Sequence, residues 1–295
     1  MNWQDIEQAI SDATGTPFVL DTRGNIGGGC INTAMKVSGR GREFFVKLNA
    51  SRLLAMFEAE AEGLREMAAA GTVRIPQPVC TGVAGNQAFI VMEYLVLGGH
   101  GGAVVMARFG EQLAQMHRHT APRYGWHRDN TIGSTPQFNH WMDDWLAFWR
   151  EHRLGYQLQL AGRHGIGRRA VQKGERLQEK LSGLFDGYQA LASVLHGDLW
   201  SGNFGISQED EPVIFDPAVY FGDREADLAM TELFGGFGRE FYAGYNGVWP
   251  LDPGYALRKT LYNLYHILNH FNLFGGGYGA QAEAMMDRLL AEVNG

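Results

Sequence analysis

The sequence predicts an α+β protein of two lobes, a small β-rich N-lobe over residues 1–97 and a larger, mainly helical C-lobe over residues 98–295. Three observations predict this architecture. The hydrophobic pattern is typical of short strands before residue 97 and of helices after residue 104. The glycine-rich stretch LGGHGG lies at 97–102, where the pattern changes. The length of 295 residues is near the upper limit of about 250 to 300 residues for a single core.

The N-lobe is expected to contain about five strands and one principal helix. Asn2 is a candidate cap for a first amphipathic helix that runs to about residue 13. The next three runs are rich in β-forming residues and are joined by glycine-rich turns, which predicts an antiparallel meander. A run of helix formers then ends at Gly71, and two more strands follow. The expected ranges are strands at 17–22, 30–38 and 42–49, the helix at 53–70, and strands at 77–83 and 87–95.

Helical periodicity dominates the C-lobe, with only short strand candidates between the helices. Ligands bind preferentially between two such lobes, so we expect the functional site at their junction. The expected helices are 104–119, 139–160, 166–187, 254–274 and 279–293, and the strand candidates are 193–195, 203–207 and 212–216.

Composition excludes several classes of partner. The net charge is −7, from 32 acidic and 25 basic side chains, so the chain has no general field that attracts nucleic acid or an anionic membrane. Its two cysteines are too few for a disulfide framework, which fits a reducing compartment. The N-terminus lacks the basic and apolar regions of a signal peptide, and no run approaches the roughly 20 apolar residues of a membrane span. We therefore expect a cytoplasmic protein.

The loop HGDLWSGN at 196–203 carries the first chemical signal. Asp198 and Asn203 lie in this loop, and Asp216 follows the strand-like run PVIF. In phosphoryl transfer, one carboxylate orients the acceptor hydroxyl and takes its proton, while a second carboxylate and an amide oxygen hold Mg²⁺ against the phosphates. His-Gly-Asp alone is also a common turn sequence, so the interpretation depends on its partners.

A lysine and a glutamate in the N-lobe are the expected partners. Lys47 lies in the strand-like run FFVKLN, after a glycine-rich turn, as expected of a lysine that reaches the α- and β-phosphates of a nucleotide. Glu60 on the following helix is suited to pair with Lys47, and Glu58 and Glu62 are the competing choices. At about 100° per residue only one of the three glutamates points well into the cleft, and we favour Glu60.

The glycine turn GGGCIN at 27–32 has two interpretations. Gly27, Gly28 and Gly29 would allow backbone N–H groups to approach phosphates, and the alternative is an ordinary tight hairpin. Cys30 in this turn is either a redox-sensitive thiol or a plain small residue.

The strand FIVMEYL is predicted to lead into the connection between the lobes. Backbone groups near Glu93 and Leu95 are candidates for binding the adenine edge, and Met92 is a candidate for the rear of the nucleotide pocket. The alternative for these three residues is an ordinary core strand.

At this point the chain resembles the protein-kinase-like superfamily, in its small-molecule branch with His-Gly-Asp, which also includes aminoglycoside phosphotransferases. The segments FFVKLN, VLHGDLWSGN, FDPAVYFGDREADLAM and LYHILNHFNLFG resemble most closely the fructosamine kinase (ketosamine-3-kinase) family, and the likeness runs from about residue 17 to 278. The resemblance implies a bilobal protein-kinase-like fold. It also implies transfer of phosphate from ATP, with Mg²⁺, to the 3-hydroxyl of a ketosamine such as a ribulosamine, erythrulosamine or fructosamine adduct, which leads to deglycation.

The resemblance also implies roles for individual residues. Asp198 is the implied base, Asn203 and Asp216 the Mg²⁺ ligands, and Lys47 and Glu60 the pair that positions the phosphates. His196 and Asp227 are expected to support the backbone of the catalytic loop. On the acceptor side the resemblance points to Trp200, Asp223, Arg224, Gln137 and Asn139 as substrate residues.

Two other functions remain as alternatives. One is a kinase of another small hydroxyl compound, such as an aminoglycoside, choline or a sugar, and the other is a nucleotide-binding pseudokinase. The substrate is expected to be a small ketosamine or a glycated protein lysine, and the sequence leaves the oligomeric state open.

Overall fold

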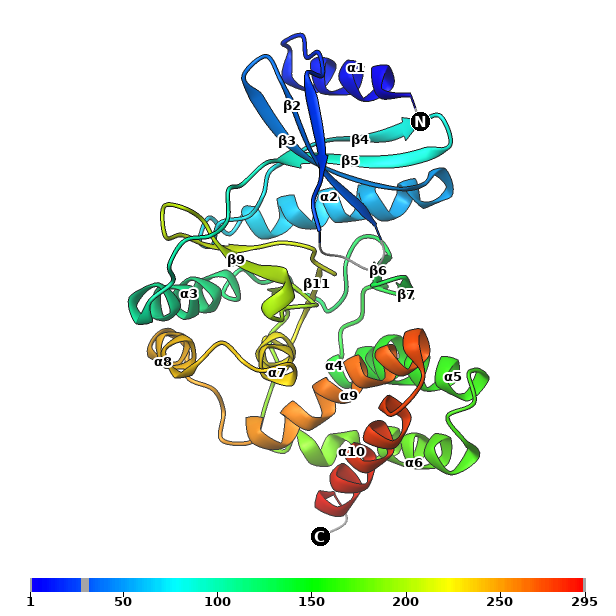
Figure 1. The fold of residues 1–295 in the computed structure, drawn as a ribbon. Helices are drawn as coiled ribbons and strands as arrows, with labels where there is room; N and C mark the ends of the chain where they lie inside the picture. The colour runs from blue at the N-terminus through cyan, green and yellow to red at the C-terminus, as the bar shows by residue number, and fades with distance from the viewer. Residues whose placement is uncertain (1, 28–31, 294–295) are drawn as a thin grey trace.

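The computed structural model describes residues 2–27 and 32–293 of the chain. Figure 1 shows a sheet with two helices at the N-terminal end and a larger assembly of helices toward the C-terminus. The predicted α+β class is therefore confirmed. The division at residues 97 and 98 stays a prediction; the N-terminal sheet ends at Glu93 and the next helix begins at Ala103.

The N-terminal sheet has five antiparallel strands in the order β1-β2-β3-β5-β4. Side chains alternate between its faces: Phe89 and Val91 pack in the cluster that includes α1, whereas Ile90 and Met92 pack in the cluster that includes α2. Both helices thus bury one apolar face against the sheet. The elements are α1 (Trp3–Thr14), β1 (Thr22–Asn25), β2 (Thr33–Gly39), β3 (Arg42–Ala50), the short 3₁₀ helix η1 (Ser51–Leu53), α2 (Leu54–Ala68), β4 (Pro78–Ala84) and β5 (Gln87–Glu93).

The predicted strand at 17–22 is wrong in all but its last residue, because β1 begins at Thr22. Side chains of helix α1 take two of the backbone donors of this segment instead. The amide of Phe18 donates to Ser11 Oγ at 2.8 Å, and the amide of Leu20 donates to Glu7 Oε1 at 2.8 Å. Because these N–H groups bond to side chains, they are not available to a sheet ladder.

The C-terminal part is built around α9, whose residues from Leu261 to Leu268 are buried almost throughout. Helices α3 and α8 meet at two glycines: a Cβ on Gly110 would lie 2.0 Å from the carbonyl oxygen of Phe241, and one on Gly244 would lie 2.1 Å from that of Ala107. The elements are α3 (Ala103–Met116), β6 (Asn130–Ile132), β7 (Thr135–Gln137), α4 (Trp145–Phe148), the π-helical segment η2 (Trp149–Gly155), α5 (Tyr156–Arg163), α6 (Arg168–Glu179), the short 3₁₀ helix η3 (Leu181–Leu184), β8 (Ser193–Leu195), the short 3₁₀ helix η4 (Ser201–Asn203), β9 (Phe204–Ile206), β10 (Pro212–Ile214), β11 (Tyr220–Gly222), α7 (Glu225–Leu233), α8 (Arg239–Val248), α9 (Tyr255–Phe274) and α10 (Tyr278–Glu292).

The helix predicted at 139–160 begins only at Trp145. Residues 139–142 instead pair with an earlier loop: the backbones of Tyr124 and Met142 exchange two hydrogen bonds of 2.9 Å, and the amide of Trp126 donates to the carbonyl oxygen of Asn139 at 2.7 Å. The structure also adds β6, β7, β11 and α8, which were not expected. The short strands are only three residues long, too short for a periodic signal.

The connection from β5 to α3 is tied to the hairpin of β9 and β10. The amides of Gly98 and Gly99 both donate to the carbonyl oxygen of Ile206, at 2.9 and 3.2 Å, and the amide of His100 donates to Asp210 Oδ1 at 3.0 Å. A Cβ on Gly99 would lie 2.0 Å from the carbonyl oxygen of Ser207, so this close approach requires glycine.

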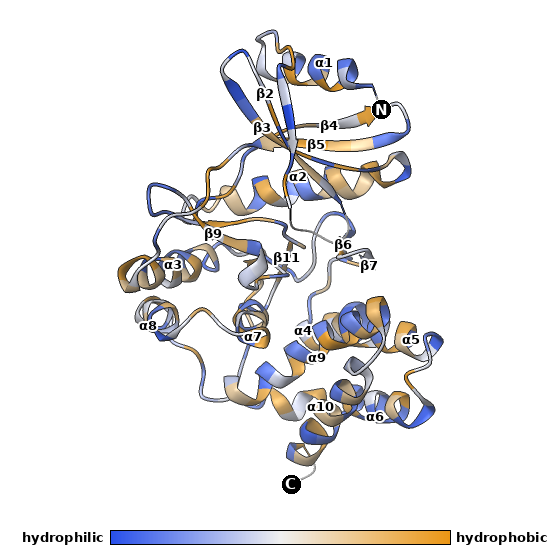
Figure 2. Ribbon diagram, in the orientation of Figure 1, coloured by the Kyte–Doolittle hydropathy of each residue, from blue (hydrophilic) through white to orange (hydrophobic). Residues whose placement is uncertain are grey.

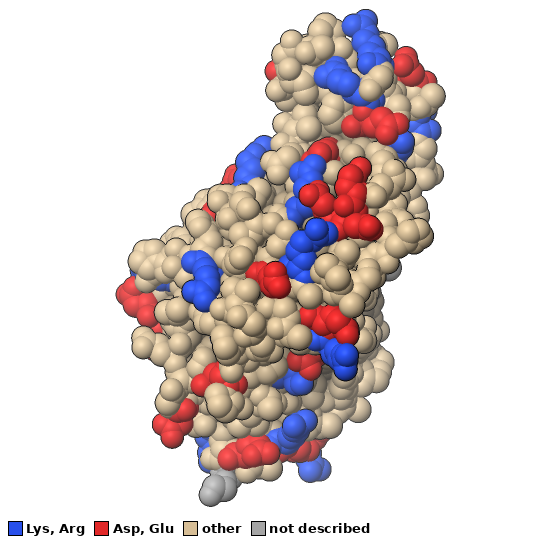
Figure 3. Space-filling model, turned by 90° about the vertical axis from the view of Figure 1, so that its left-hand side faces the viewer, with Lys and Arg blue, Asp and Glu red and all other residues tan. Residues whose placement is uncertain are grey.

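Hydropathy and charge are mixed along the described chain. Figure 2 shows hydrophilic and hydrophobic residues interspersed in the helices, and none of the helices described is long and apolar enough to cross a membrane. On the face shown in Figure 3, basic and acidic side chains are interspersed.

Candidate active site

The loop at 196–203 leaves β8, a buried three-residue strand that pairs with β11. The loop turns at Gly197, which has φ of 79° and whose Cβ, if it had one, would lie 2.1 Å from the carbonyl oxygen of Ala218. Only glycine fits both the dihedral and the close approach. These two constraints explain why a glycine stands between His196 and Asp198.

The carboxylate of Asp227, on α7, holds the first two residues of this loop. It accepts hydrogen bonds from the amide of His196 at 2.7 Å and from the amide of Gly197 at 2.8 Å. His117 contacts the same carboxylate at 3.2 Å through Nε2, and its Nδ1 lies 2.8 Å from the hydroxyl of Tyr245. Burial and, less strongly, Arg224 lower the pKa of His117, so this ring is neutral and supports a buried anion. His117 was missed at the sequence level, although a histidine on the apolar face of α3 is an unusual core residue.

Asp198 and Asn203 are in direct contact. Asn203 Nδ2 donates to the carbonyl oxygen of Asp198 at 2.8 Å and to Asp198 Oδ2 at 3.1 Å, and it lies 3.4 Å from the carbonyl oxygen of Asp216. Burial, reinforced by the charges of Asp216 and Asp227, raises the pKa of Asp198 well above its ordinary value despite the bond from Asn203. The amide group of Asn203 therefore joins the ends of the two aspartate-bearing loops.

His196 is buried and points into the protein. Its Nδ1 accepts from the amide of Asp198 at 3.2 Å, so its Nε2 carries the proton that is donated to the carbonyl oxygen of Phe215 at 2.9 Å. Burial lowers the pKa of His196 and keeps the ring neutral. Its two hydrogen bonds link the loop at 198 with the loop at 215.

Asp216 follows β10 with φ of 58°, a left-handed conformation that aspartate tolerates better than most residues. Its carboxylate forms an ion pair with Lys47, and its side chain keeps 46% of its surface exposed. Asp216 thus faces the junction of the lobes with one oxygen engaged and the rest of the carboxylate open to a ligand.

Lys47 joins the N-terminal sheet to the C-terminal part. It lies on β3, and its Nζ contacts both Asp216 and Glu60, the latter at 2.5 Å. Burial alone would lower the pKa of the Lys47 ammonium, but the two carboxylates outweigh burial and raise it. Glu60 is the glutamate of α2 that contacts Lys47, whereas Glu58 and Glu62 lie near Arg128.

Of the three glycines of the turn at 27–32, Gly27 is the one that the structure describes, and it is exposed. Gly28, Gly29 and Cys30 lie outside the described residues. In the connection between the lobes, Met92 is buried and the amide of Glu93 donates to the carbonyl oxygen of Gln77 at 2.9 Å. The backbone of Leu95 makes no hydrogen bond with any other residue that the structure describes.

Of the five residues expected to contact substrate, Trp200 is the one that is exposed to solvent, and it follows Asp198 by two positions. It is 36% exposed, and its ring folds over Gly202 and contacts Phe234 edge to face at a centroid distance of 6.0 Å. The Trp200 side chain therefore remains partly accessible beside the loop at 196–203.

Asp223 and Arg224 are buried, and the structure does not bring them to the loop surface. Asp223 accepts hydrogen bonds from the hydroxyls of Tyr188 at 2.8 Å and Tyr262 at 2.5 Å. Arg224 donates to the carbonyl oxygens of Trp249 and Pro250 at 3.0 and 2.6 Å. Their polar groups are thus engaged within the C-terminal part.

Gln137 and Asn139 are also buried with protein partners. Gln137 Nε2 donates to the carbonyl oxygen of Ala218 at 3.0 Å, close behind Asp216, and its Oε1 accepts from Tyr265 at 2.7 Å. Asn139 Oδ1 accepts from Arg153 at 2.7 Å. Arg153 itself is fully buried in η2, with its guanidinium 3.9 Å from the ring centroid of Tyr220, and no sequence signal pointed to it.

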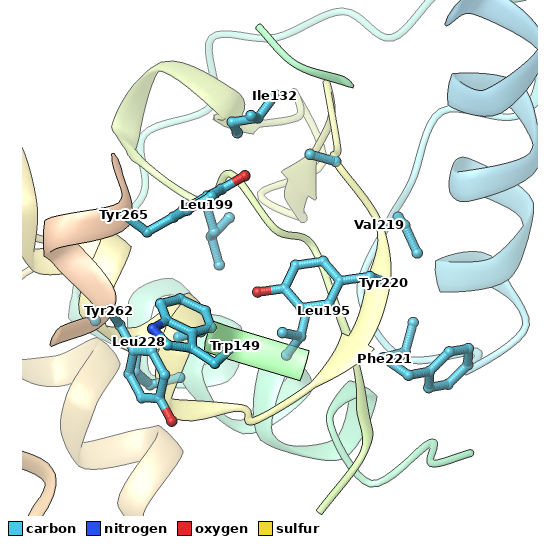
Figure 4. Close-up of a cluster of buried hydrophobic side chains, with 14 of the residues drawn as sticks. Ile132, Trp149, Leu195, Leu199, Val219, Tyr220, Phe221, Leu228, Tyr262 and Tyr265 are labelled. Atoms are coloured by element: carbon cyan, nitrogen blue, oxygen red, sulfur yellow. The ribbon is translucent and has the colours of Figure 1, made fainter. Parts of the chain in front are cut away.

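An apolar and aromatic cluster lies beneath the catalytic loop. Figure 4 shows Leu195, the last residue of β8, and Leu199, within the loop, turned toward the rings of Tyr265, Tyr220 and Trp149. All five side chains are at most 2% exposed. The loop is therefore held at its base by packing and at its backbone by Asp227.

The arrangement as a whole has the parts that phosphoryl transfer requires: a cation from the sheet, two carboxylates on adjacent loops and an amide between them. No group of three or more His, Cys, Asp or Glu side chains that could hold a metal occurs among the described residues. A transition-metal site is thus not indicated in this part of the chain.

Comparison with known proteins gives consistent matches over nearly the whole chain. The family model named fructosamine kinase matches residues 2–292. A probable ketoamine kinase of Synechocystis sp. is 48% identical over 289 residues, which cover 98% of this chain and 97% of that protein. A chloroplastic protein-ribulosamine 3-kinase of Arabidopsis thaliana is 46% identical over 271 residues, covering 90% and 82% of the two chains. The crystal structure of a putative fructosamine-3-kinase from Haemophilus somnus superposes with a TM-score of 0.89 at 27% identity and 98% coverage of both chains.

Proposed function

The chain belongs to the fructosamine kinase family and is a phosphotransferase of the ketosamine-3-kinase type, and we propose that it phosphorylates the 3-hydroxyl of a ketosamine at the expense of ATP. The observation that carries the proposal is the contact of Lys47 with both Glu60 and Asp216, beside a loop in which Asp198 and Asn203 touch. These groups come from two parts of the chain and meet where a nucleotide and an acceptor must meet.

The nucleotide is proposed to lie between the sheet and the loop at 216. Lys47 binds the α- and β-phosphates, and Glu60 holds its ammonium in place. The open backbone of Leu95 binds the adenine edge next to Glu93, with Met92 behind the base. The glycine turn that begins at Gly27 covers the phosphates. We propose residues 1–97 as the nucleotide-binding lobe and residues 98–295 as the lobe that carries the catalytic loop and binds the acceptor.

Asp216 and Asn203 are proposed to hold Mg²⁺. The donor set fits this ion, because Mg²⁺ takes oxygen ligands, one or two of them from the protein and others from water and the nucleotide phosphates. Asp216 keeps nearly half of its side chain exposed, and the amide oxygen of Asn203 makes no described hydrogen bond. When bound, the ion neutralises charge that develops on the transferring phosphoryl group.

Asp198 is proposed as the base that orients the acceptor hydroxyl and takes its proton. Its raised pKa suits this task, since a carboxylate of higher pKa is a better proton acceptor. The neutral ring of His196 fixes the backbone on both sides of the site and takes no part in proton transfer. Asp227 supports the same loop through its two backbone hydrogen bonds.

The sugar is proposed to stack on Trp200, whose exposed ring lies next to the base. Asp223, Arg224, Gln137 and Asn139 were expected to contact substrate. Because their polar atoms are buried and engaged by protein partners, we propose that they shape the wall behind Asp216 and leave the sugar to Trp200.

The substrate is proposed to be a ribulosamine, erythrulosamine or fructosamine, carried by a small amine or by a protein lysine. A phosphate at carbon 3 is a good leaving group, so the adduct then decomposes and releases the amine. The printed name of the Arabidopsis thaliana relative, a protein-ribulosamine 3-kinase, supports this class. We propose a cytoplasmic location, for which the small number of cysteines is the support.

A substrate panel tests the proposal. Purified protein with Mg-ATP is incubated with the three ketosamines, an aminoglycoside, choline and a simple sugar, and release of ADP is followed. We expect turnover of at least one ketosamine, absent in Asp198→Asn. Turnover of another acceptor without any ketosamine would overturn the substrate assignment, and nucleotide binding without turnover of any acceptor would favour the pseudokinase.

A further inference from the structure

Helix α2 has two acidic faces, and only one of them belongs to the site described above. Glu60 points inward to Lys47, whereas Glu62 and Glu66 point to a segment of the C-terminal part. This segment, residues 124–130, runs from the end of the α3 region into β6, and we call it the α2 brace. Since residues two apart on a helix lie roughly 200° apart around its axis, Glu60 and Glu62 are on nearly opposite sides of α2.

Glu62 is the centre of the contact between α2 and the brace. Its Oε1 accepts from Arg128 Nη1 at 2.7 Å and its Oε2 accepts from His127 Nε2 at 2.8 Å. Arg128 also donates through Nη2 to the backbone carbonyl oxygen of Ala55, in the first turn of α2, at 3.2 Å. Although partial burial acts in the opposite direction, the hydrogen bonds from His127 and Arg128 keep the pKa of Glu62 below its ordinary value. The first turn of α2, at Ala55, and its middle, at Glu62, are thus both hydrogen-bonded to one short segment.

The brace is attached at its other side to the chain that follows Asp216. The backbones of Gly125 and Phe221 exchange hydrogen bonds of 2.9 and 2.8 Å, and Asn130 Nδ2 donates to the carbonyl oxygen of Val219 at 2.8 Å. Helix α2 also packs on this chain directly, because Gly63 has no side chain: a Cβ there would lie 3.0 Å from Val219 Cγ2. The helix, the brace and residues 217–221 therefore form a closed set of contacts.

This closed set fixes the position of Glu60 relative to Asp216, and Lys47 contacts both carboxylates. We propose that Glu62 and Arg128 are positioning residues for nucleotide binding: through the brace they hold α2 inward, so that the Lys47–Glu60 pair is formed before ATP arrives. The inference deepens the proposed function and rests on it only in assigning Lys47 and Glu60 to ATP. Since α2 is already in position when ATP binds, no interaction free energy is lost in moving it, and ATP binds more tightly.

An isolated surface ion pair would not have this effect, since such pairs contribute little. The pair of Arg123 and Asp143 provides the comparison, because it lies one residue before the brace, is joined at 2.6 Å, and contacts no part of α2. Glu62 differs in accepting from His127 and Arg128, which lie on a segment whose ends are hydrogen-bonded to residues 219–221.

The test measures the dissociation constant of Mg-ATP by titration calorimetry, without a ketosamine, together with the melting temperature of each variant. Glu62→Met and Arg128→Met are each expected to raise the dissociation constant about threefold to fivefold. The double variant should lose less affinity than the sum of the two single losses, since both single variants remove the contact between Glu62 and Arg128. Arg128→Lys, which keeps the charge, should recover part of the affinity, and Arg123→Met should match the unchanged protein.

The decisive comparison is made in a Glu60→Gln background. If the brace acts through the Lys47–Glu60 pair, Glu62→Met should have no further effect on ATP binding there. An equal loss of affinity in both backgrounds would overturn the proposal, as would unchanged affinity in Glu62→Met and Arg128→Met, or a loss fully accounted for by unfolded protein in the melting curves. Because this experiment measures ATP binding without a ketosamine, its result can be interpreted even if the protein phosphorylates no ketosamine.

Discussion

Replacing Asp227 by asparagine perturbs the catalytic loop at one point without removing any atom that contacts the proposed substrates. The carboxylate accepts from His196 N and His117 Nε2 through Oδ2, and from Gly197 N through Oδ1. An asparagine side chain can keep its oxygen at the first position, but its NH₂ group then faces the N–H of Gly197. One buried donor loses its acceptor, and the remaining bonds lose the charge of the carboxylate.

The magnitude follows from these contacts. A buried donor left without a partner costs about 1 to 3 kcal/mol, and weakening charge-assisted bonds to neutral ones costs about 1 kcal/mol more. We therefore expect Asp227→Asn to lower the free energy of unfolding by about 2 to 4 kcal/mol. Because Gly197 directly precedes Asp198, the proposed base, we also expect turnover with a ketosamine to fall at least about tenfold.

The acid dependence of stability provides a second readout. Burial by itself would raise the pKa of Asp227, but the hydrogen bonds from His117 and from the amide of Gly197 outweigh burial and lower it in the folded protein. Such a group contributes stability that is fully present above its ordinary pKa of about 4 and is lost as the pH falls through the lower folded value. The Asp227→Asn variant should therefore lack this contribution to the loss of unfolding free energy at low pH.

Urea unfolding at pH 7 and at low pH, together with steady-state kinetics, measures all three quantities. Asp143→Asn serves as the control, since that side chain is 82% exposed and its loss should cost less than about 0.5 kcal/mol. An asparagine variant within 1 kcal/mol of the unchanged protein that also retained more than half of its turnover would refute the assigned role of Asp227.

Four further predictions concern the loop itself. Asp198→Asn should lower turnover about 10²- to 10⁴-fold while leaving the melting temperature unchanged or higher at neutral pH, because the buried charge with its raised pKa is removed; a lower melting temperature would contradict this. In the unchanged enzyme turnover should rise with pH through that raised pKa, as the base loses its proton, and a pH profile that falls over the same range would speak against Asp198 as the base. Gly197→Ala should cost at least about 2 kcal/mol of unfolding free energy, because φ is 79° and Ala218 leaves no room for a Cβ; calorimetry that found no loss would rule out this account of the turn. Trp200→Ala should raise the KM for a ketosamine about threefold to tenfold with the KM for ATP unchanged, and equal changes in both would argue against stacking on the sugar.

Much of the fold could be predicted because its signals are local. The helices at α2, α9 and α10 and the strands at β3, β5 and β8 lie within a few residues of their expected ranges. Errors arose where distant residues supply the hydrogen bonds. The amides of Phe18 and Leu20 bond to side chains of α1, and residues 139–142 pair with Tyr124 and Trp126. Such partners leave no periodic pattern in the segment they reshape.

The class of chemistry could be predicted from the order of a few residues along the chain. The order of Lys47, Asp198, Asn203 and Asp216, each next to a strand or a glycine turn, predicts phosphoryl transfer because few other reactions need this set. Which polar residues remain available to a ligand depends, in contrast, on how the chain packs. Asp223 and Arg224 stand in the same motif as Asp216, yet Tyr188, Tyr262 and the loop at 249–250 bury them. Burial depends on residues dozens of positions away, so a motif indicates what a side chain could do, and the fold decides whether it meets a ligand or the protein core.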